Sequence, residues 1–337
     1  MTRYARQVVL PEIGVRGQAK LAQAQVTVIG CGALGTAAGE ILARAGVGRL
    51  RLIDRDVVEL SNLQRQLLYT EQDAAQGLPK AEAMRTHLLQ INSSIEVTAI
   101  TADLNYRNAR DLLSESDILL DATDNFLVRL LINDVALELS IPWVYGGALG
   151  TTGMVMPVVP GRTPCFRCLV TDLPPLGQLD TCDLVGVLGS VTVMVAAQQA
   201  AHVLHLLVEG ESLATGLLEF DPWHGQCRRL NLPADPNCPA CQQGRREFLQ
   251  GAHAREAIAL CGRDAVQVWP TQTSQVDLAA LAERLSALGK THFNRFTLRF
   301  QPQDSLLQIT VFRDGRAVIK GIDVPEQALA IYSRYLG

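Results

Sequence analysis

The stretch that decides the fold is residues 25–54, which reads QVTVIGCGALGTAAGEILARAGVGRLRLID. It begins with a short run rich in β-branched residues and continues through the glycine-rich GCGALG into a helix-forming segment. It ends in a second strand-like run, RLRLID. Gly46 and Gly48 mark the exit of the helix, because glycine commonly follows a helix C-terminus. The order strand, glycine turn, helix and strand predicts a β-α-β unit of a parallel sheet.

Further strands and helices alternate on the C-terminal side of this unit. Strand-like runs lie at 95–100, 117–122 and 142–149, with helical runs between them at 80–91 and 125–139. This alternation predicts an α/β fold with a doubly wound, Rossmann-like and mostly parallel sheet. Ligands of such sheets bind beyond the carboxyl ends of the strands. The loops after Ile29, Ile53 and Ala122 are therefore expected to form a site.

The rest of the chain predicts an excursion from the sheet and then a second domain. Residues 163–189 are rich in Pro, Gly and Cys, and an apolar helix at 191–208 follows them. The polar run QQGRRE at 242–247 is typical of a linker. We therefore predict one domain over residues 1–245 and a small α+β domain over residues 246–337. The elements expected in the second domain are a helix at 276–288, strands at 296–300, 306–312 and 317–321, a hairpin turn at Asp314-Gly315, and a helix at 325–336.

Composition argues against several classes of protein. The 337 residues carry a formal net charge of −4 and no basic tract, which argues against nucleic-acid binding. Residues 1–7 are polar and lead into a strand-like run at 8–10, so no secretory signal is expected. The apolar helix at 191–208 contains four polar residues, Gln199 and His202 among them, and is expected to be buried rather than to cross a membrane. We predict a cytoplasmic protein that binds neither nucleic acid nor membranes.

Residues 30–35 match the pattern GxGxxG between a strand and a helix. Gly30, Gly32 and Gly35 allow a tight turn and a close approach of phosphate to the helix N-terminus, and Ala33 lies within the same turn. Asp54 ends the next strand, where an acidic side chain can bind a ribose hydroxyl. Taken alone, the motif fits NAD, FAD or ATP, and the plain alternative is a glycine turn without a ligand.

The loops that follow favour ATP over a nicotinamide cofactor. SNLQRQ at 61–66 comes just after the acidic residue, Lys80 opens the following helix, and DATDN at 121–125 ends a later strand. Arg65 and Lys80 can offset phosphate charge, and Asp124 offers the hard oxygen ligand that Mg²⁺ prefers. Each of these residues taken singly is common on protein surfaces. Their gathering at one edge of the sheet indicates a site for a nucleoside triphosphate with Mg²⁺.

Two Cys-x-x-Cys pairs predict a zinc site. Cys165, Cys168, Cys238 and Cys241 can supply the four thiolates of a closed, structural Zn²⁺ tetrahedron. A redox role is the alternative, and neither pair lies at the strand-to-helix junction that such motifs prefer. Cys182 lies in the loop before the apolar helix, where a helix N-terminus would lower its pKa and make it a nucleophile. The alternative for Cys182 is a half-buried free cysteine.

These features together resemble the ThiF/MoeB/HesA adenylyltransferases, bacterial relatives of the ubiquitin-activating enzymes. The resemblance extends from RYARQ at 3–7 to Cys241, and a C-terminal extension like this one occurs in some ThiF-like proteins. The shared features are GxGxxG, Asp54, SNLQRQ, the Pro79-Lys80 pair, DATDN, both cysteine pairs and the Thr-Cys-x-x-x-Gly loop at 181–186. The chain departs from the family at Ala33, Val193 and Ala196, where relatives often have glycine.

The resemblance implies a role for each matching residue. Asp54 would bind the ribose of ATP, Asn62, Arg65 and Lys80 would contact its phosphates, and Asp124 would hold Mg²⁺. Gln66 and Asn125 belong to the same motifs and are grouped with the nucleotide-binding residues. Arg6 would reach as an arginine finger into the other subunit of a homodimer. Cys182 matches a position that joins covalently to the carrier protein in some relatives.

The resemblance also implies the reaction. The partner would be a small ubiquitin-fold carrier protein ending in Gly-Gly, such as ThiS or MoaD, whose C-terminal carboxylate is adenylated by ATP. The expected setting is sulfur transfer for thiamine or molybdopterin biosynthesis, with ubiquitin-like conjugation or a specialised-metabolite sulfur system as alternatives. No rhodanese-like domain follows, so a separate sulfur donor is expected. A nicotinamide-dependent oxidoreductase and a non-catalytic nucleotide-binding scaffold are the competing classes.

Overall fold

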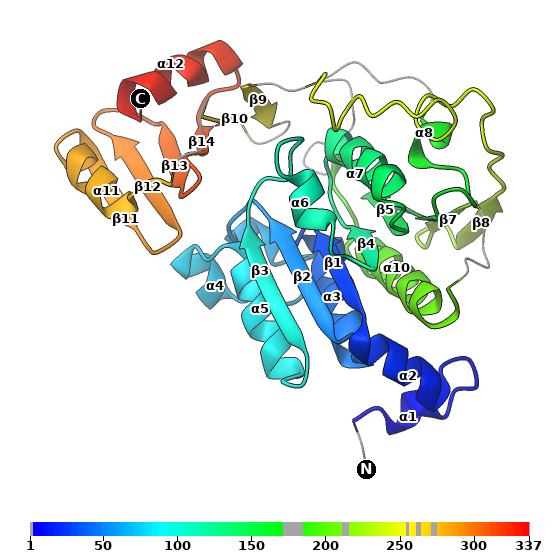
Figure 1. The fold of residues 1–337 in the computed structure, drawn as a ribbon. Coiled ribbons are helices and arrows are strands. Elements are labelled where there is room, and N and C mark those ends of the chain that lie inside the picture. The colour runs from blue at the N-terminus through cyan, green and yellow to red at the C-terminus, as the bar shows by residue number, and fades with distance from the viewer. Residues whose placement is uncertain are drawn as a thin grey trace. The chain divides into compact units, whose positions relative to one another are not determined.

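A computed structural model describes residues 3–170, 185–210, 216–253, 256–260, 264–270 and 275–336. Two compact units divide these residues (Figure 1): the first contains those up to 253, and the second those from 256 onward. Each unit has its own sheet and its own hydrophobic core.

The first unit is built on an eight-stranded sheet with the order β3-β2-β1-β4-β5-β6-β7-β8. The first five strands in this order are parallel, and β6, β7 and β8 continue the sheet in antiparallel pairing. The strands are β1 (Gln25–Ile29), β2 (Arg49–Asp54), β3 (Glu96–Thr101), β4 (Ile118–Asp121), β5 (Trp143–Leu149), β6 (Thr152–Val158), β7 (Leu217–Asp221) and β8 (Gln226–Leu230).

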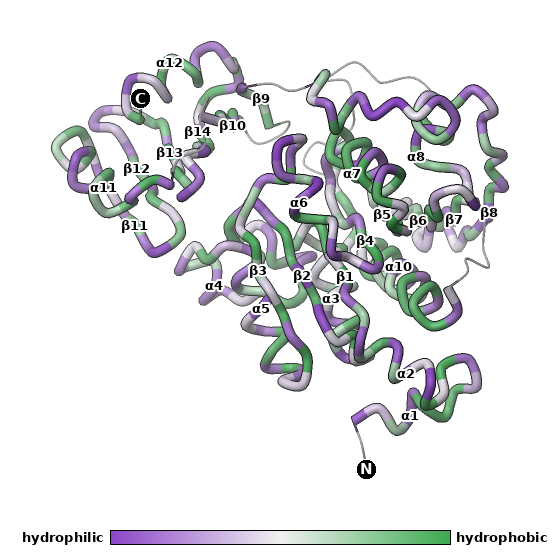
Figure 2. Tube along the Cα trace, in the orientation of Figure 1, coloured by the Kyte–Doolittle hydropathy of each residue, from purple (hydrophilic) through white to green (hydrophobic). Residues whose placement is uncertain are grey.

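Helices cover both faces of this sheet (Figure 1). One face packs against α3 (Ala33–Ala45), α5 (Lys80–Ile91) and α10 (Gly189–Glu209), and the other against α6 (Ala109–Leu113) and α7 (Phe126–Leu139). Val26 and Val28 of β1 belong to the first core and Ile29 to the second. The two central strands, β1 and β4, are buried on both sides and carry mostly apolar residues, as expected for parallel strands covered on both faces (Figure 2). The doubly wound, mostly parallel α/β sheet is thus confirmed.

Shorter helices complete the first unit, and one of them corrects the sequence analysis. They are α1 (Ala5–Val8), α2 (Gly14–Gln23), α4 (Glu71–Gln76), α8 (Phe166–Leu169) and the 3₁₀ helix η1 (Leu60–Asn62). The strand expected at 8–10 is wrong, because α1 ends at Val8 and the chain turns into α2. Val9 is 77% exposed and pairs with no strand. A short apolar run by itself does not separate a strand from a turn between helices.

Among the described residues, α10 is the one helix long and apolar enough to cross a membrane by length and composition. It packs against α3, β5 and β6 in the core of the first unit. Gln199, which lies on this helix and is fully buried, donates to the carbonyl oxygens of Asp121 (2.6 Å) and Val144 (3.2 Å). This packing agrees with the prediction of a buried helix.

The second unit is a six-stranded antiparallel sheet with the order β11-β12-β13-β14-β10-β9 and two helices. Leu281 and Leu285 of its first helix pack into the same core as Phe300 and Ile319 of the sheet. Gly315 has φ +82° in the turn between β13 and β14, which confirms the predicted hairpin. The elements are β9 (Ala257–Leu260), β10 (Ala265–Val268), α11 (Leu278–Ser286), β11 (Gly289–Phe293), β12 (Thr297–Pro302), β13 (Gln308–Phe312), β14 (Ala317–Lys320) and α12 (Pro325–Tyr335).

Candidate active site

Two glycines of the turn after β1, Gly30 and Gly35, have no room for a side chain. Gly30 has φ +91°, and a Cβ atom on it would lie 2.7 Å from the carbonyl oxygen of Ala122. A Cβ atom on Gly35 would lie 1.9 Å from the carbonyl oxygen of Gly30, so both positions require glycine. Gly32 is the N-cap of α3 and Ala33 is its first residue. The N-terminal end of α3, with its free N–H groups, therefore faces the carboxyl edge of the sheet.

Asp54, the last residue of β2, ties this turn to the next loop. Its Oδ2 accepts from the backbone N–H of Cys31 (2.6 Å), and its Oδ1 accepts from that of Asp56 (2.7 Å). Burial raises the pKa of Asp54, the Lys80 ammonium opposes this shift, and the Asp56 carboxylate adds to it. Below, the "strand-end rim" means the loops after β1, β2, β3 and β4 together with the start of α5.

Lys80, the first residue of α5, is held at the strand-end rim. Its Nζ lies 3.4 Å from Oδ2 of Asp56, and its backbone N–H donates to the Asp56 carbonyl oxygen (2.9 Å). The Tyr69 hydroxyl lies 2.7 Å from the carbonyl oxygen of Cys31 and 3.0 Å from that of Lys80. Tyr69, which the sequence analysis missed, therefore joins the glycine turn to α5. Tyr69 is a single aromatic residue in a loop, and no sequence motif distinguishes it.

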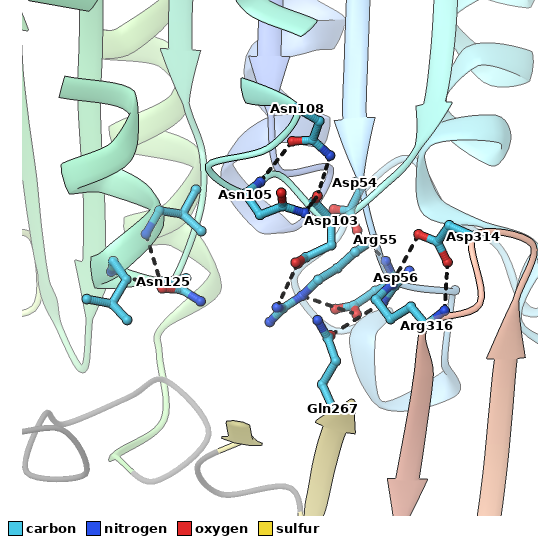
Figure 3. Close-up of polar contacts among 12 residues, drawn as sticks. Asp54, Arg55, Asp56, Asp103, Asn105, Asn108, Asn125, Gln267, Asp314 and Arg316 are labelled. Carbon is cyan, nitrogen blue, oxygen red and sulfur yellow. Dashed lines mark hydrogen bonds and ion pairs between the residues drawn. The ribbon is translucent and has the colours of Figure 1, made fainter. Parts of the chain in front are cut away.

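Arg55 connects two carboxylates at the ends of β2 and β3 (Figure 3). Its Nη1 lies 3.0 Å from Oδ1 of Asp103, and its Nε lies 3.8 Å from Oδ1 of Asp56. The side-chain amides of Asn105 and Asn108 both donate to the carbonyl oxygen of Asp103, at 3.0 and 2.9 Å. Burial lowers the pKa of Arg55, but the nearby carboxylates outweigh it and raise this pKa above its usual range. No sequence motif marks Arg55 as a site residue.

The loop that follows β2 contributes amides. Asn62 is buried, and its Oδ1 accepts from the backbone N–H of Glu59 (3.1 Å), so this side chain shapes the turn. Arg65 is half-buried and donates to the Ser61 carbonyl oxygen (3.2 Å). Gln66 is buried beside Gly32, and its Oε1 has no hydrogen-bond partner among the described residues. A buried acceptor left open next to the glycine turn fits a site that receives a ligand with donor groups.

The DATDN segment at 121–125 divides into buried and exposed parts. Asp121 is fully buried, where its Oδ2 lies 3.3 Å from Nε of Arg129 and its Oδ1 accepts from the Thr123 hydroxyl (2.7 Å). Asp124 is exposed, and its charge acts on Arg55. The Asn125 side chain accepts from two backbone N–H groups at the start of α7 and so caps this helix (Figure 3).

Arg6 lies far from the glycine turn of its own chain. The built Cβ of Gly46, just past the C-terminus of α3, would lie 2.5 Å from the Tyr4 ring, and Gln7 donates to the Ala45 carbonyl oxygen (2.8 Å). These contacts place α1, which contains the exposed Arg6, at the C-terminal end of α3. Since α3 has 13 residues, the glycine turn at its other end is about 20 Å away. The structure therefore does not bring Arg6 together with the other predicted residues.

The four cysteines of the two Cys-x-x-Cys pairs meet, although the pairs lie 73 positions apart. The Sγ–Sγ distances are 3.9 Å for Cys165–Cys168, 3.6 Å for Cys165–Cys238 and 3.6 Å for Cys168–Cys241. A tetrahedron with Zn–S bonds of about 2.3 Å has S–S edges of about 3.8 Å. Burial and the three neighbouring thiols raise the pKa of Cys165, and a cation bound among the four sulfurs would oppose this rise. The cluster could bind zinc.

Helix α7 and a set of aromatic rings fix the first cysteine pair. The side-chain oxygen of Asn133 accepts from the backbone N–H of Phe166 (2.9 Å), one residue after Cys165. The Phe166 ring lies 5.0 Å from that of Tyr145 and 5.9 Å from that of Trp143. The cysteine cluster is therefore packed against the core of the first unit. Cys182 lies outside the described residues.

Comparisons with known proteins found a matching family, similar relatives and similar solved structures. The ThiF family matches residues 4–240. The chain is 40% identical over 99% of its length, and 99% of the other chain, to the sulfur carrier protein ThiS adenylyltransferase of Bacillus subtilis. It is 35% identical, over 77% of its length and 96% of the other chain, to the SAMP-activating enzyme E1 of Haloferax volcanii. The crystal structure of E. coli MccB with ATP aligns with a TM-score of 0.63 and 27% identity, over 71% of this chain and 74% of that one.

Proposed function

The chain belongs to the ThiF family, and on that basis we propose that it is an adenylyltransferase that activates the C-terminal carboxylate of a sulfur carrier protein with ATP. The observation that carries this proposal is the 40% identity to a ThiS adenylyltransferase over 99% of both chains. The proposed partner is a ubiquitin-fold carrier ending in Gly-Gly, and the proposed setting is thiamine or molybdopterin biosynthesis. The adenylating domain, expected over residues 1–245, would be the first unit, which extends to residue 253, and the residues from 256 onward would be a small separate domain.

ATP would bind at the strand-end rim. The glycines of residues 30–35 let phosphate oxygens approach the N-terminal end of α3, where free N–H groups and the helix dipole favour negative charge. Asp54 would accept from the ribose hydroxyls, and the open Oε1 of Gln66 would accept from a nearby donor. Asn62 would support this loop and Arg65 would contact phosphate. These roles are supported by the positions of the side chains and by the likeness to an ATP complex of MccB.

The reaction joins two anions, so the site must supply positive charge. A carrier carboxylate oxygen attacks the α-phosphorus of ATP, the bond to the bridging oxygen breaks, and pyrophosphate leaves with its electron pair. Arg55 and Lys80 already pair with carboxylates of the protein, Asp103 and Asp56. We therefore expect Lys80 to be assisted by further cations, Arg65 and a Mg²⁺ ion held by Asp124. Mg²⁺ would neutralise developing charge on the phosphates.

We propose that Arg6 supplies one of these charges to a second copy of the chain in a homodimer. An arginine side chain cannot span the length of α3, so Arg6 has no access to the rim of its own chain. Mixing inactive Arg6→Ala and Lys80→Ala proteins under subunit exchange should restore up to about a quarter of the parent activity, because half the dimers then contain one complete site. No recovery on mixing would refute a finger acting between subunits.

Zinc in the cysteine cluster would be structural, because four protein thiolates leave no position open for substrate. Cys182 is proposed as the acceptor of the carrier's acyl group: its thiolate would attack the carbonyl carbon of the acyl-adenylate, a thioester bond would form, and AMP would leave. A Cys182→Ser protein that still forms the same covalent adduct would rule this out. Sulfur itself would come from a separate donor protein.

The experiment that tests the proposed function is ATP–pyrophosphate exchange with purified protein, Mg²⁺ and carriers ending in Gly-Gly. We expect exchange that depends on one carrier and that Asp124→Ala abolishes while carrier binding persists. Because one relative is named an activating enzyme of the SAMP type, the set of carriers should include conjugation-type ubiquitin-fold proteins as well as ThiS-like ones. ATP binding without exchange for any carrier would favour a scaffold, and full exchange by Asp124→Ala would refute the assigned role of that residue.

A further inference from the structure

We propose that Asp56 is a positioning residue for Lys80, and that Arg55 and Asp103 hold Asp56 in place. The inference rests on the proposed function, because it assigns to Lys80 the task of meeting the phosphates. It adds a relay of three side chains behind that lysine, running from the end of β3 through the end of β2 to the start of α5. None of the three matches the phosphate-binding motifs of the sequence.

The contact between Asp56 and Lys80 is built from both backbone and side chain. The Asp56 carbonyl oxygen accepts from the Lys80 N–H at 2.9 Å, and Oδ2 of Asp56 lies 3.4 Å from Nζ of Lys80. The neighbouring residues Val57 and Pro79 form an isolated β-bridge, and the N–H of Val58 donates to the Leu78 carbonyl oxygen (2.8 Å). The two segments are thus paired over several residues, so the backbone that carries the Asp56 carboxylate is held in place.

Burial makes this ion pair effective. The Lys80 side chain is 5% exposed and that of Asp56 is 22% exposed, so water screens their attraction only in part. Lysine has a long flexible stem with three donors on its ammonium. A carboxylate that occupies one donor holds the stem in one conformation and leaves two donors for phosphate oxygens. The lysine then loses less freedom when the nucleotide binds.

Arg55 and Asp103 fix the carboxylate itself. Arg55 lies between Asp56 and Asp103, with N–O distances of 3.8 and 3.0 Å (Figure 3). Asp103 is buried, and its backbone is clamped by Asn105 and Asn108. The Asp103 end of the relay is therefore rigid, and Arg55 transmits that rigidity to Asp56. Asp54 acts differently, because both of its oxygens accept backbone N–H groups and hold the loop.

A double-mutant cycle on Asp56 and Lys80 tests the inference, with exchange rates normalised to the sites counted by ATP titration. We expect Asp56→Asn to slow carrier-dependent exchange about 10- to 100-fold and Lys80→Ala about 100- to 1,000-fold. The double variant should be no slower than Lys80→Ala alone, because Asp56 acts through the lysine. Asp103→Asn should slow exchange about threefold to tenfold, as it lies one step further away.

The matched control is Glu115→Gln. Glu115 pairs with Arg51 of β2 in an ion pair away from the strand-end rim, so its loss should leave exchange unchanged. An exchange rate of Asp56→Asn equal to that of the parent would overturn the inference. So would an equal reduction of the rate by Asp56→Asn in the parent and in the Lys80→Ala protein. A parent protein without exchange would instead refute the proposed function. The same four proteins are then compared by their affinity for ATP. If the effects of the two substitutions on the free energy of ATP binding are additive, the positioning role is also overturned.

Discussion

The strand-end rim and the cysteine cluster lie in the same unit but differ in their electrostatics: the rim pairs opposite charges, and the cluster gathers groups of like charge. At the rim, carboxylates and cations alternate from Asp103 through Arg55 and Asp56 to Lys80, so the charges largely hold one another. In the cluster, four like groups lie within 4.8 Å of one another and repel as thiolates. The charges of the rim can therefore be paired within the protein. The cluster could instead hold a cation that offsets the charges of four thiolates.

The largest effect on stability is expected from disruption of the cysteine cluster. Cys165→Ser, or removal of metal by a strong chelator, should release bound zinc and lower the free energy of unfolding by several kcal/mol, because the remaining ligands are held by the metal. Metal analysis and thermal melting measure both. Cys227→Ser is the control, since Cys227 is exposed on β8 and outside the cluster, and it should change neither quantity. Equal metal content in both variants would contradict the zinc assignment.

The next largest effect is expected from a substitution in the glycine turn of the strand-end rim. Gly35→Ala should lower the free energy of unfolding by about 3 kcal/mol and weaken ATP binding, because its Cβ would overlap the Gly30 carbonyl oxygen. Gly32→Ala is the matched control for folding: its nearest neighbour would be Nε2 of Gln66 at 3.8 Å, in open contact. Melting curves and ATP titration separate the two variants. Similar stability of both would show that the turn relaxes more easily than its geometry indicates.

The smallest expected effect is a pH dependence of the free energy of unfolding that comes from one buried carboxyl group. Asp134 of α7 is buried and accepts from the backbone N–H groups of Phe248 (2.9 Å) and Leu249 (3.3 Å), and its pKa is raised to about 6, mainly by burial. The folded protein therefore keeps a proton between about pH 4 and pH 6 that the unfolded chain has released. Asp134 should make the free energy of unfolding fall as pH rises through this interval, by on the order of 2 kcal/mol.

Asp134→Asn should remove this contribution. The measurement is the difference in unfolding free energy between parent and variant at several pH values, because the cysteine cluster contributes equally to both and cancels. A difference that does not change between pH 4 and pH 7 would contradict the raised pKa. Since Asn keeps an oxygen that can accept from both N–H groups, the fold itself should persist.

Local patterns in the sequence predict elements formed by residues close in the chain, but they do not predict elements that depend on long-range contacts. The parallel strands, their helices and the hairpin at Asp314-Gly315 follow from hydrophobic period and turn residues, and the structure confirms them. β6 and β8, which extend the sheet in antiparallel pairing, escaped because their partners decide their conformation. The strand expected at 8–10 failed for the same reason, as three apolar residues carry no preference that packing cannot overrule.

The sites divide in the same way. Glycine at positions 30 and 35, an acid at the end of β2 and the cysteine spacing are visible in the chain because the chemistry demands those residue types. Tyr69 and Arg129 carry no motif, and they became meaningful only when their hydrogen bonds and ion pairs were seen. Asn125 was grouped with the nucleotide-binding residues, yet its side-chain oxygen caps α7.

By itself the sequence determined the ThiF-type fold, the glycine turn and the identity of the four cysteines, because each depends on residues close in the chain or on a residue type with no substitute. Only the tertiary structure decided which charges meet. It joined Asp103 to Lys80 through Arg55 and Asp56, and it placed Arg6 at the far end of α3 from the glycine turn. Distances between side chains depend on the crossing and register of whole elements, and no local pattern records them.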